Sequence, residues 1–248
     1  MKFLGIIPAR YSSSRFPGKP LAILGGKPVI QHVYERVKNV LTDVYVATDN
    51  VHIYKVVTDF GGKAIMTREE HESGTERASE ALDKIEGKFD VVINIQGDEP
   101  FIQSEQIKML MSSFADAHTQ IATLGVPLKS MDDVSKSNTP KIVIDNHNNA
   151  LYFSRSVIPF VRGINQSDWL SHYPFLKHVG LYAYRTETLR EISKLPVSSL
   201  ELAERLEQLR WLQNGYRIKV CITDIETISI DTPQDLVNAE EYLKQINL

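Results

Sequence analysis

Three cations near the start of the chain have the spacing of a phosphate-binding loop. Arg10, Arg15 and Lys19 follow the apolar segment Phe3–Ile7. Cations at these positions would neutralise anionic oxygens. Small residues that let backbone N–H groups approach such oxygens lie among them: Ser12, Ser13, Ser14 and Gly18. The pattern predicts a cradle for a polyphosphate, and the alternative is a solvated basic loop.

Neither of two common phosphate-binding loops fits this segment. The glycines at 5, 18, 25 and 26 do not have the G-x-G-x-x-G spacing that binds dinucleotides. The Gly-Lys pairs at 18–19 and 26–27 are each followed by proline, where a P-loop has the Ser or Thr that contacts Mg²⁺. The sequence therefore argues against a dehydrogenase and against a P-loop ATPase.

Two carboxylates are placed to hold a divalent cation. Asp98 follows the apolar run 91–95, with Gly97 allowing a tight turn between them, and Asp231 follows the apolar segment Ile228–Ile230. At the carboxyl end of a parallel strand Asp98 would face the cationic loop, and Asp231 is free to reach the same ion. Because carboxylates are ligands that Mg²⁺ prefers, we predict that Asp98 and Asp231 share this ion. The alternative for Asp98 is a turn residue between a strand and a helix.

Two helix starts lie next to these candidates. Ser73 fits the N-cap of a capping box, yet Arg77, one turn further on, is still able to contact a ligand. Thr232 and Asp235 fit a second capping box. Asp235 thus has a structural explanation, whereas Asp231 has none and is left for the metal.

The second half of the chain offers residues that suit an acidic ligand. Arg155 has the fork of donors that binds a carboxylate through two hydrogen bonds. His178 and Tyr182 would share one face of a strand, because side chains alternate with a period of two, and Gly180 and Tyr184 would lie on that face as well. On a helix from Leu200, we expect a core face that leaves Glu204 and Gln208 projecting elsewhere, formed by Leu202, Leu206 and Leu209.

The elements that position these residues alternate between strand and helix in the first half. Near-continuous apolar strands separated by helices indicate an α/β fold with a mostly parallel sheet covered by helices on both faces. The predicted strands are Phe3–Ile7, Val44–Thr48, Ala64–Met66, Val91–Gln96 and Ile121–Val126, and Pro8 is expected to end the first of them. The predicted helices are Val29–Lys38, Val51–Phe60, Thr75–Ile85 and Ser104–Phe114.

The pattern changes after residue 140. Residues Lys141–Phe153 flank a polar turn and predict an inserted antiparallel hairpin, while residues 159–174 have weak periodicity and are expected to form a loop. The remaining predicted elements are strands His178–Tyr184 and Ile218–Ile222 and helices Thr186–Lys194, Leu200–Asn214 and Pro233–Gln245.

Composition limits the classes of function. The chain has 248 residues and a net charge of -3, which argues against a nucleic-acid binder because such proteins concentrate basic charge over a whole face. Cys221 is the one cysteine, cannot form an internal disulfide and is expected to be a buried strand residue. The N-terminal apolar run is too short for a signal peptide, and no stretch is long enough to cross a membrane. We therefore expect a cytoplasmic protein.

Several motifs together resemble the CMP-Kdo synthetase family, the 3-deoxy-manno-octulosonate cytidylyltransferases. The match runs in order along nearly the whole chain, through PARYSSSRFPGKP, MTREEHESGTER, INIQGDEP, ATLGVP, ALYFSR, HVGLYAYR, LEQLR and IDTPQDL. The segment 161–174 matches no block of the family well. The resemblance implies a Rossmann-like nucleotidyltransferase fold in a single domain, 1–248. About 1–130 and 215–248 would bind the nucleotide, and about 131–214 would bind the sugar and form a dimer.

The resemblance also implies an activity and a set of roles. Enzymes of this family are Mg²⁺-dependent cytoplasmic homodimers that convert CTP and 3-deoxy-manno-octulosonate (Kdo) to CMP-Kdo and pyrophosphate for lipopolysaccharide synthesis. The catalytic residues would be Arg10, Lys19, Asp98 and Asp231, of which the two aspartates bind the metal. The nucleotide would be bound by Arg10, Arg15, Lys19, Ser73, Arg77 and Gln96, and the sugar acid by Arg155, His178, Tyr182, Glu207 and Gln208.

Two other functions compete with this one. A cytidylyltransferase for another acidic sugar, such as 8-amino-Kdo or sialic acid, would carry the same nucleotide residues. A catalytically silent nucleotide-binding protein would have little need of both metal carboxylates, so the presence of Asp98 and Asp231 with Arg10 and Lys19 argues against it.

Overall fold

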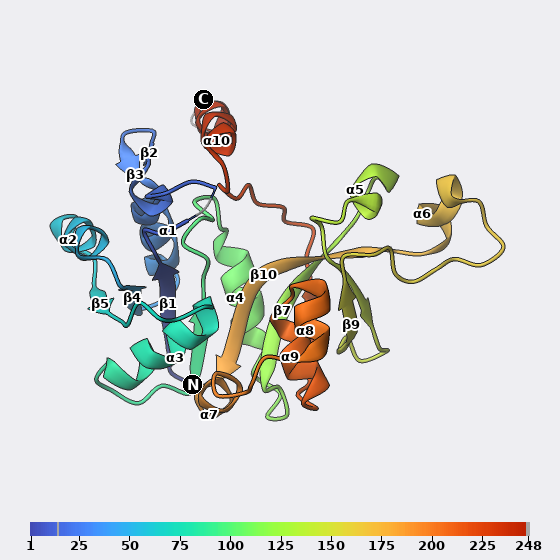
Figure 1. The fold of residues 1–248 in the computed structure, drawn as a ribbon, viewed down its shortest axis with the longest axis horizontal. Helices are drawn as coiled ribbons and strands as arrows, with labels where there is room; N and C mark the ends of the chain where they lie inside the picture. The colour runs from blue at the N-terminus through green and yellow to red at the C-terminus, as the bar shows by residue number, and fades with distance from the viewer. Residues whose placement is uncertain (14, 247–248) are drawn as a thin grey trace. The chain divides into compact units, whose positions relative to one another are not determined.

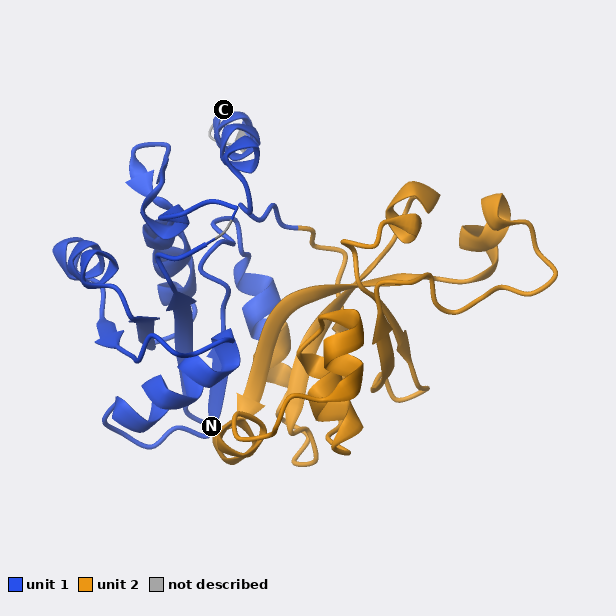
Figure 2. Cartoon of the chain, in the orientation of Figure 1, with its two compact units in different colours: residues 1–108, 227–248 blue, residues 109–226 orange. Residues whose placement is uncertain are grey.

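The computed structural model describes residues 1–13 and 15–246, so Ser14 of the cationic loop lies outside the described residues. The chain forms two compact units (Figure 2). Unit 1 comprises residues 1–108 and 227–248, and unit 2 comprises residues 109–226. The boundary falls within helix α4 (Ser104–Ser113). No described helix is long and apolar enough to cross a membrane.

Unit 1 contains a parallel sheet, as the sequence predicts. Its strands lie in the order β6 (Val91–Asn94), β1 (Phe3–Ala9), β4 (Asp43–Thr48) and β5 (Ala64–Met66). Each neighbouring pair runs parallel. All four residues of β6 are buried, which is typical of a parallel strand covered on both faces.

Helices α1 (Val29–Lys38), α2 (Val51–Asp59) and α3 (Gly74–Lys84) of unit 1 pack against this sheet, and α10 (Pro233–Ile246) packs against β2 (Ile23–Leu24) (Figure 1). All four helices begin and end within one residue of their predicted bounds. Three short elements that the sequence did not predict follow the cationic loop: the 3-10 turn η1 (Lys19–Leu21) and strands β2 (Ile23–Leu24) and β3 (Lys27–Pro28).

Pro8 lies inside β1, so the prediction that it ends this strand is wrong. The backbone N–H of Ile95 donates to the carbonyl of Ile6 at 2.9 Å, so the polar groups of Ile6 face β6. Pro8, two residues further on, faces the same side, where β6 has already ended at Asn94. The missing N–H of Pro8 therefore costs the sheet no ladder hydrogen bond.

Unit 2 has a mixed sheet. Strand β7 (Ile121–Pro127) pairs antiparallel with β10 (Leu176–Arg185) and parallel with β11 (Ile218–Ile222). The predicted hairpin is confirmed as β8 (Lys141–Ile144) and β9 (Ala150–Ser154), and β8 joins the sheet by pairing with the start of β10. Cys221 lies in β11 as expected, but it is half-buried instead of buried.

The segment 159–174 is more ordered than the expected loop. It contains η2 (Gln166–Asp168) and α6 (Trp169–His172), and α5 (Met131–Ser135) precedes the hairpin. The buried side chain of Trp169 packs in a small core with Leu128, Val134 and Phe175. This aromatic anchor, and not the weak periodicity around it, decides the local structure.

The single helix predicted over Leu200–Asn214 is wrong, because the structure has two. Helix α7 (Thr186–Ile192) is followed by α8 (Ser199–Glu204) and α9 (Gln208–Gln213). Arg205 separates α8 from α9 with a left-handed backbone, φ 53°. The break also turns Leu202 outward, 55% exposed, while Leu206 and Leu209 are buried as predicted.

Candidate active site

The cationic loop is closed by its own backbone. Gly18 adopts φ 71°, a conformation that glycine accepts without cost, and its N–H donates to the carbonyl of Tyr11 at 2.9 Å. Lys19 is the first residue of η1, directly after this closure. The position of the lysine is therefore fixed by a glycine that the sequence places immediately before it.

Lys19 joins the two predicted metal carboxylates. Its Nζ donates to Asp98 Oδ2 at 2.5 Å and to Asp231 Oδ1 at 3.2 Å. Arg15 also donates to Asp231 Oδ1, at 3.2 Å. Asp98 and Asp231, 133 positions apart in the sequence, thus share one ammonium group.

Backbone contacts bring the chain around Asp231 to Asp98. The N–H of Ile230 donates to the carbonyl of Asp98 at 2.9 Å, and the hydroxyl of Thr227 donates to Glu99 at 2.6 Å. Gly97 allows a further close approach, because a Cβ at this position would lie 2.9 Å from the carbonyl oxygen of Pro8. Any other residue at 97 would push the Asp98 turn away from the end of β1.

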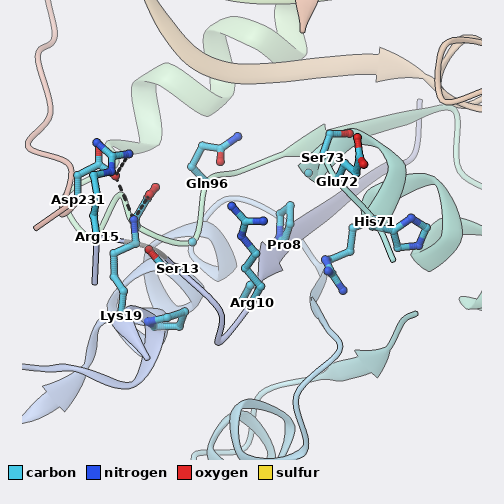
Figure 3. A pocket seen from close by; sticks show the side chains of 16 residues that line it. Pro8, Arg10, Ser13, Arg15, Lys19, His71, Glu72, Ser73, Gln96 and Asp231 are labelled. Atoms are coloured by element: carbon cyan, nitrogen blue, oxygen red, sulfur yellow. Dashed lines mark hydrogen bonds and ion pairs between the residues drawn. The ribbon is translucent and has the colours of Figure 1, made fainter. Parts of the chain in front are cut away.

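These residues line a cavity of about 240 Å³ in unit 1 (Figure 3). All eight predicted catalytic and nucleotide-binding residues line it: Arg10, Arg15, Lys19, Ser73, Arg77, Gln96, Asp98 and Asp231. Figure 3 shows the group of Arg15, Lys19 and Asp231 at one end and His71, Glu72 and Ser73 at the other, with Arg10 and Gln96 between them. Arg10 is exposed and forms no hydrogen bond or ion pair with the described residues, so its guanidinium is available to an anion.

Ser73 and Arg77 have structural partners as well as a place in this cavity. The hydroxyl of Ser73 accepts from the N–H of Glu76 at 3.1 Å and caps α3. Arg77 is 3% exposed, and its guanidinium donates to Asp49 at 2.7 Å and to Thr67 at 2.6 Å. Most donors of Arg77 are therefore used inside the protein, and the part that it presents to the cavity is small.

His71 also lines this cavity, although it was not predicted as part of the site. His71 resembles a solvated loop histidine in the sequence, but its side chain is only 8% exposed and its Nε2 contacts Glu80. Burial acts to raise the pKa of Glu80, and contacts with Lys84, His71 and Arg68 outweigh it and lower that pKa to about 2. No periodic pattern links His71 to Glu80, nine residues later, so the pair becomes visible only in the fold.

The described acidic side chains of this cavity are too few to hold a metal ion without other ligands. Within residues 1–13 and 15–246, no three His, Cys, Asp or Glu side chains are arranged to hold a metal ion by themselves. Asp98 and Asp231 alone supply two oxygen donors at one point. That donor set suits an ion that takes its other ligands from water and phosphate, which is how Mg²⁺ is usually bound.

The predicted sugar residues of unit 2 are centred on β10 and α9. The rings of His178 and Tyr182 lie 5.2 Å apart, although a β-bulge between Val179 and Tyr182 interrupts the regular alternation that we assumed. Nε2 of His178 lies 3.1 Å from the hydroxyl of Thr123. Burial of the imidazole lowers the pKa of His178 to about 3, so the ring is neutral at physiological pH.

Unpaired polar atoms gather around these rings. The hydroxyl of Tyr182, Nε2 of Gln208 and Nε1 of Trp211 are buried and have no hydrogen-bond partner of good geometry among the described residues. The rings of Tyr182 and Trp211 are in edge contact, with centroids 5.0 Å apart. Burial raises the pKa of Tyr182 well above its usual value, so its hydroxyl keeps its proton. Buried polar groups without partners are costly, and a polar ligand would satisfy them.

Arg155 and Glu207 are placed differently from the other sugar candidates. The guanidinium of Arg155 donates to the carbonyls of Glu204, Arg205 and Ser137 at 2.7, 3.2 and 3.1 Å. Three of its five N–H groups are used in this way, and two remain for a ligand. Glu207 is the N-cap residue of α9, next to Gln208.

Comparisons with known proteins agree over the whole chain. A sequence profile of the family described as Cytidylyltransferase matches residues 4–222. The 3-deoxy-manno-octulosonate cytidylyltransferase of Bacteroides thetaiotaomicron is 61% identical over 98% of this chain and 99% of its own. The 8-amino-3,8-dideoxy-manno-octulosonate cytidylyltransferase of Shewanella pealeana is 48% identical over 96% of this chain and 97% of its own. The solved structure of a CMP:2-keto-3-deoxy-manno-octonic acid synthetase complexed with CTP superposes with a TM-score of 0.92 at 43% identity, covering 99% of this chain and 100% of that one.

Proposed function

Because the chain belongs to the 3-deoxy-manno-octulosonate cytidylyltransferase family, we propose that it converts CTP and Kdo to CMP-Kdo and pyrophosphate, a step of lipopolysaccharide biosynthesis. Full-length identity of 61% to a cytidylyltransferase for this sugar supports the substrate. The observation that carries the chemistry is the Lys19 ammonium between Asp98 and Asp231, in a cavity that Arg10 also lines.

The reaction is an in-line displacement at the α-phosphorus of CTP. The hydroxyl on C2 of Kdo forms the new P–O bond, the bond to the β-phosphate breaks, and pyrophosphate leaves with the negative charge while the hydroxyl proton passes to solvent. Phosphoryl and nucleotidyl transfers depend mainly on positioning and on charge stabilisation. Arg10, Lys19 and Arg15 supply positive charge for the triphosphate and the departing pyrophosphate, and Ser73, Arg77 and Gln96 surround the nucleoside.

Mg²⁺ fits the two carboxylates of the cavity. Asp98 and Asp231 converge on one cation, Lys19, and would hold the metal through one oxygen donor each. When bound, Mg²⁺ supplies positive charge to the phosphate oxygens of the nucleotide. Lys19, which neutralises both carboxylates in this structure, would then serve the pyrophosphate.

The sugar acid is assigned to unit 2. Tyr182 and Gln208 offer buried polar atoms without hydrogen-bond partners of good geometry in the described part of the chain, which is the state expected of groups that bind a ligand rich in hydroxyls. The two remaining N–H groups of Arg155 would bind the carboxylate, with His178 and Glu207 completing the set. The neutral state of His178 favours a hydrogen bond to a hydroxyl over an ion pair with the carboxylate.

We further propose a homodimer in the cytoplasm, where CTP is available. Large apolar side chains of unit 2 are exposed in the single chain, among them Leu151, 62% exposed, and Phe160, 74% exposed. Both lie within the part that we assign to dimerisation, residues 131–214, and a second copy of the chain would cover them.

A substrate matrix tests the activity. Pyrophosphate release is measured with CTP, UTP, ATP and GTP, each with Kdo, 8-amino-Kdo and sialic acid, in the presence of Mg²⁺. We expect release with CTP and Kdo at least tenfold faster than with any other pair. Faster release with CTP and 8-amino-Kdo would move the chain to the specificity of the Shewanella pealeana relative, and no release with any pair would contradict the proposed reaction.

A further inference from the structure

The turn between α8 and α9 is attached to β9 by one carboxylate. Glu204, the last residue of α8, accepts the hydroxyl of Ser154 at 2.6 Å on Oε1 and the backbone N–H of Arg155 at 2.9 Å on Oε2. Both oxygens are therefore committed to consecutive residues of the same chain segment. The residue is half-buried, so these hydrogen bonds are partly shielded from water.

Two cationic side chains, Arg155 and Lys141, also support this attachment by donating hydrogen bonds to backbone carbonyls. The guanidinium of Arg155 donates back to the carbonyls of Glu204 and Arg205. Lys141 of β8 is fully buried, and its Nζ donates to the carbonyls of Arg155 at 2.7 Å and of Lys136 at 2.9 Å. Hydrogen bonds thus run in both directions between residues 154–155 and the end of α8, which fixes the left-handed residue Arg205 at the start of the α8–α9 turn.

The residue whose position depends on this attachment is Gln208. It lies four positions after Glu204, as the first residue of α9, and it is 4% exposed. Its side-chain Nε2 has no hydrogen-bond partner among the described residues, so no polar contact of that nitrogen holds the amide in place. Its position therefore depends on the backbone of the α8–α9 turn and on the packing of α9 against β9.

We propose that Glu204 is a positioning residue for the sugar-acid pocket, acting through the α8–α9 turn on Gln208. The inference rests on the proposed assignment of Gln208 to the sugar. Glu204 is not a candidate ligand itself, because both of its oxygens already accept hydrogen bonds from Ser154 and Arg155. Its effect is on where the ligand-binding amide lies.

The variant Glu204→Gln tests the proposal. It keeps the size of the side chain but presents an NH₂ group where one of two donors needs an acceptor, so one hydrogen bond of the attachment is lost. We expect the KM for Kdo to rise about tenfold, which corresponds to about 1.4 kcal/mol, with the KM for CTP changed less than twofold. Ser154→Ala removes the contact to Oε1 of Glu204 and should raise the KM for Kdo about threefold, which serves as the test if Glu204→Gln does not fold.

Three measurements separate positioning from simple loss of stability. Thermal unfolding of each variant sets an assay temperature at which all are folded. Glu187→Gln removes an exposed carboxylate from the same unit and should leave both KM values within twofold of wild type. The double variant Ser154→Ala with Glu204→Gln should raise the KM for Kdo less than the product of the two single effects, because both act on one attachment.

The KM values of the variants distinguish the role of Gln208 in the pocket from the positioning role of Glu204. Gln208→Ala should raise the KM for Kdo at least tenfold, and an unchanged value would remove Gln208 from the pocket and with it this part of the proposed function. If Gln208→Ala raises that KM but Glu204→Gln does not, the positioning role is wrong while the pocket stands. An equal rise in the KM for CTP and for Kdo in Glu204→Gln would show general loosening of the chain and would also overturn the role.

Discussion

Asp98 and Asp231 are two acceptors that share one ammonium, and the charge balance of the cavity depends on both. We predict that Asp98→Asn or Asp231→Asn lowers kcat by roughly 10²-fold or more, because each removes one electrostatic contact from the site of charge transfer. Steady-state rates over a range of Mg²⁺ concentrations measure the effect. Asp59→Asn, which removes an exposed carboxylate of unit 1, should stay within twofold of wild type. Normal turnover in either active-site variant would remove that carboxylate from the metal site.

The lowered pKa of the His178 imidazole makes stability depend on pH. Its pKa is lowered from 6.5 to about 3, so between these values the unfolded chain binds a proton that the folded protein excludes. Stability is therefore fully present above pH 6.5 and falls with pH down to about 3, by at most about 1.4 kcal/mol per pH unit. Urea unfolding at about pH 7 and pH 5.5 should show that His178→Gln loses about 1 kcal/mol less than wild type on acidification. His52→Gln, at an exposed position, should behave as wild type, and an identical loss in all three proteins would contradict the prediction.

At this scale the sequence predicts the anionic and cationic residues of the cavity but not their partners. Asp98 and the loop that carries Lys19 follow from residue type and from the rule that strand ends share an edge. Asp231 follows from residue type alone, because residues 223–230 before it form no strand. Glu204 looks like a surface residue in the sequence, and only the fold brings it to Ser154, 50 positions earlier. The indole N–H of Trp211, which has no partner among residues 1–13 and 15–246, likewise has no sequence signal, because a tryptophan in an apolar helix is typical of a buried core residue.

The predicted bounds of helices agree with the structure where buried residues recur periodically. They are wrong where the backbone conformation of one residue ends a helix. The helices of unit 1 have one apolar face each, and their bounds were predicted closely. Arg205 breaks a helical pattern without a glycine or proline to mark the position, because the carbonyls on both sides of the break are satisfied by Arg155. A distant side chain therefore stabilises a turn that local propensity does not favour.

The start of α10 links a helix cap to the metal site. The carboxylate of Asp235 accepts from the N–H groups of Asp231 and Thr232 at 3.0 and 2.8 Å, and Thr232 Oγ1 accepts from the N–H of Asp235 at 3.2 Å. This confirms the predicted capping box and shows that it also holds the backbone of Asp231. We predict that Thr232→Ala lowers the free energy of unfolding by about 1 kcal/mol and raises the Mg²⁺ concentration needed for half-maximal activity.

A matched cap in the other unit provides the control for this prediction. Ser130 caps α5 by accepting from the N–H of Asp133 at 3.1 Å. Ser130→Ala should cost a similar amount of stability, about 1 kcal/mol, but leave the Mg²⁺ requirement unchanged. Calorimetry and Mg²⁺ titration of both variants distinguish the two effects, and an equal shift of the Mg²⁺ requirement in both would show that it reports stability alone.

For the whole chain, the two compact units divide the predicted site residues by substrate. All eight residues assigned to the nucleotide and metal lie in unit 1, and all five assigned to the sugar lie in unit 2. The predicted functional division at about residues 130 and 215 does not coincide with the boundaries of the two units, since β7 and β11 belong to unit 2. It therefore stays a separate prediction. The division by substrate predicts that substitutions of the site residues in unit 1 raise mainly the KM for CTP. Substitutions of the site residues in unit 2 should raise mainly the KM for Kdo.

The exposed apolar residues of unit 2 lead to a prediction about assembly. If Leu151 and Phe160 are covered by a second copy, sedimentation should give twice the chain mass of 28.1 kDa at micromolar concentration. The variant Leu151→Asp with Phe160→Asp should sediment as a monomer, because two carboxylates cannot be buried in an apolar interface without a large desolvation cost. Val51→Asp changes a residue of unit 1 that is 66% exposed and should remain dimeric. A wild-type chain that stays monomeric up to 100-fold higher concentration would contradict the dimer, and a dimer that survives both aspartates would place its interface elsewhere on the chain.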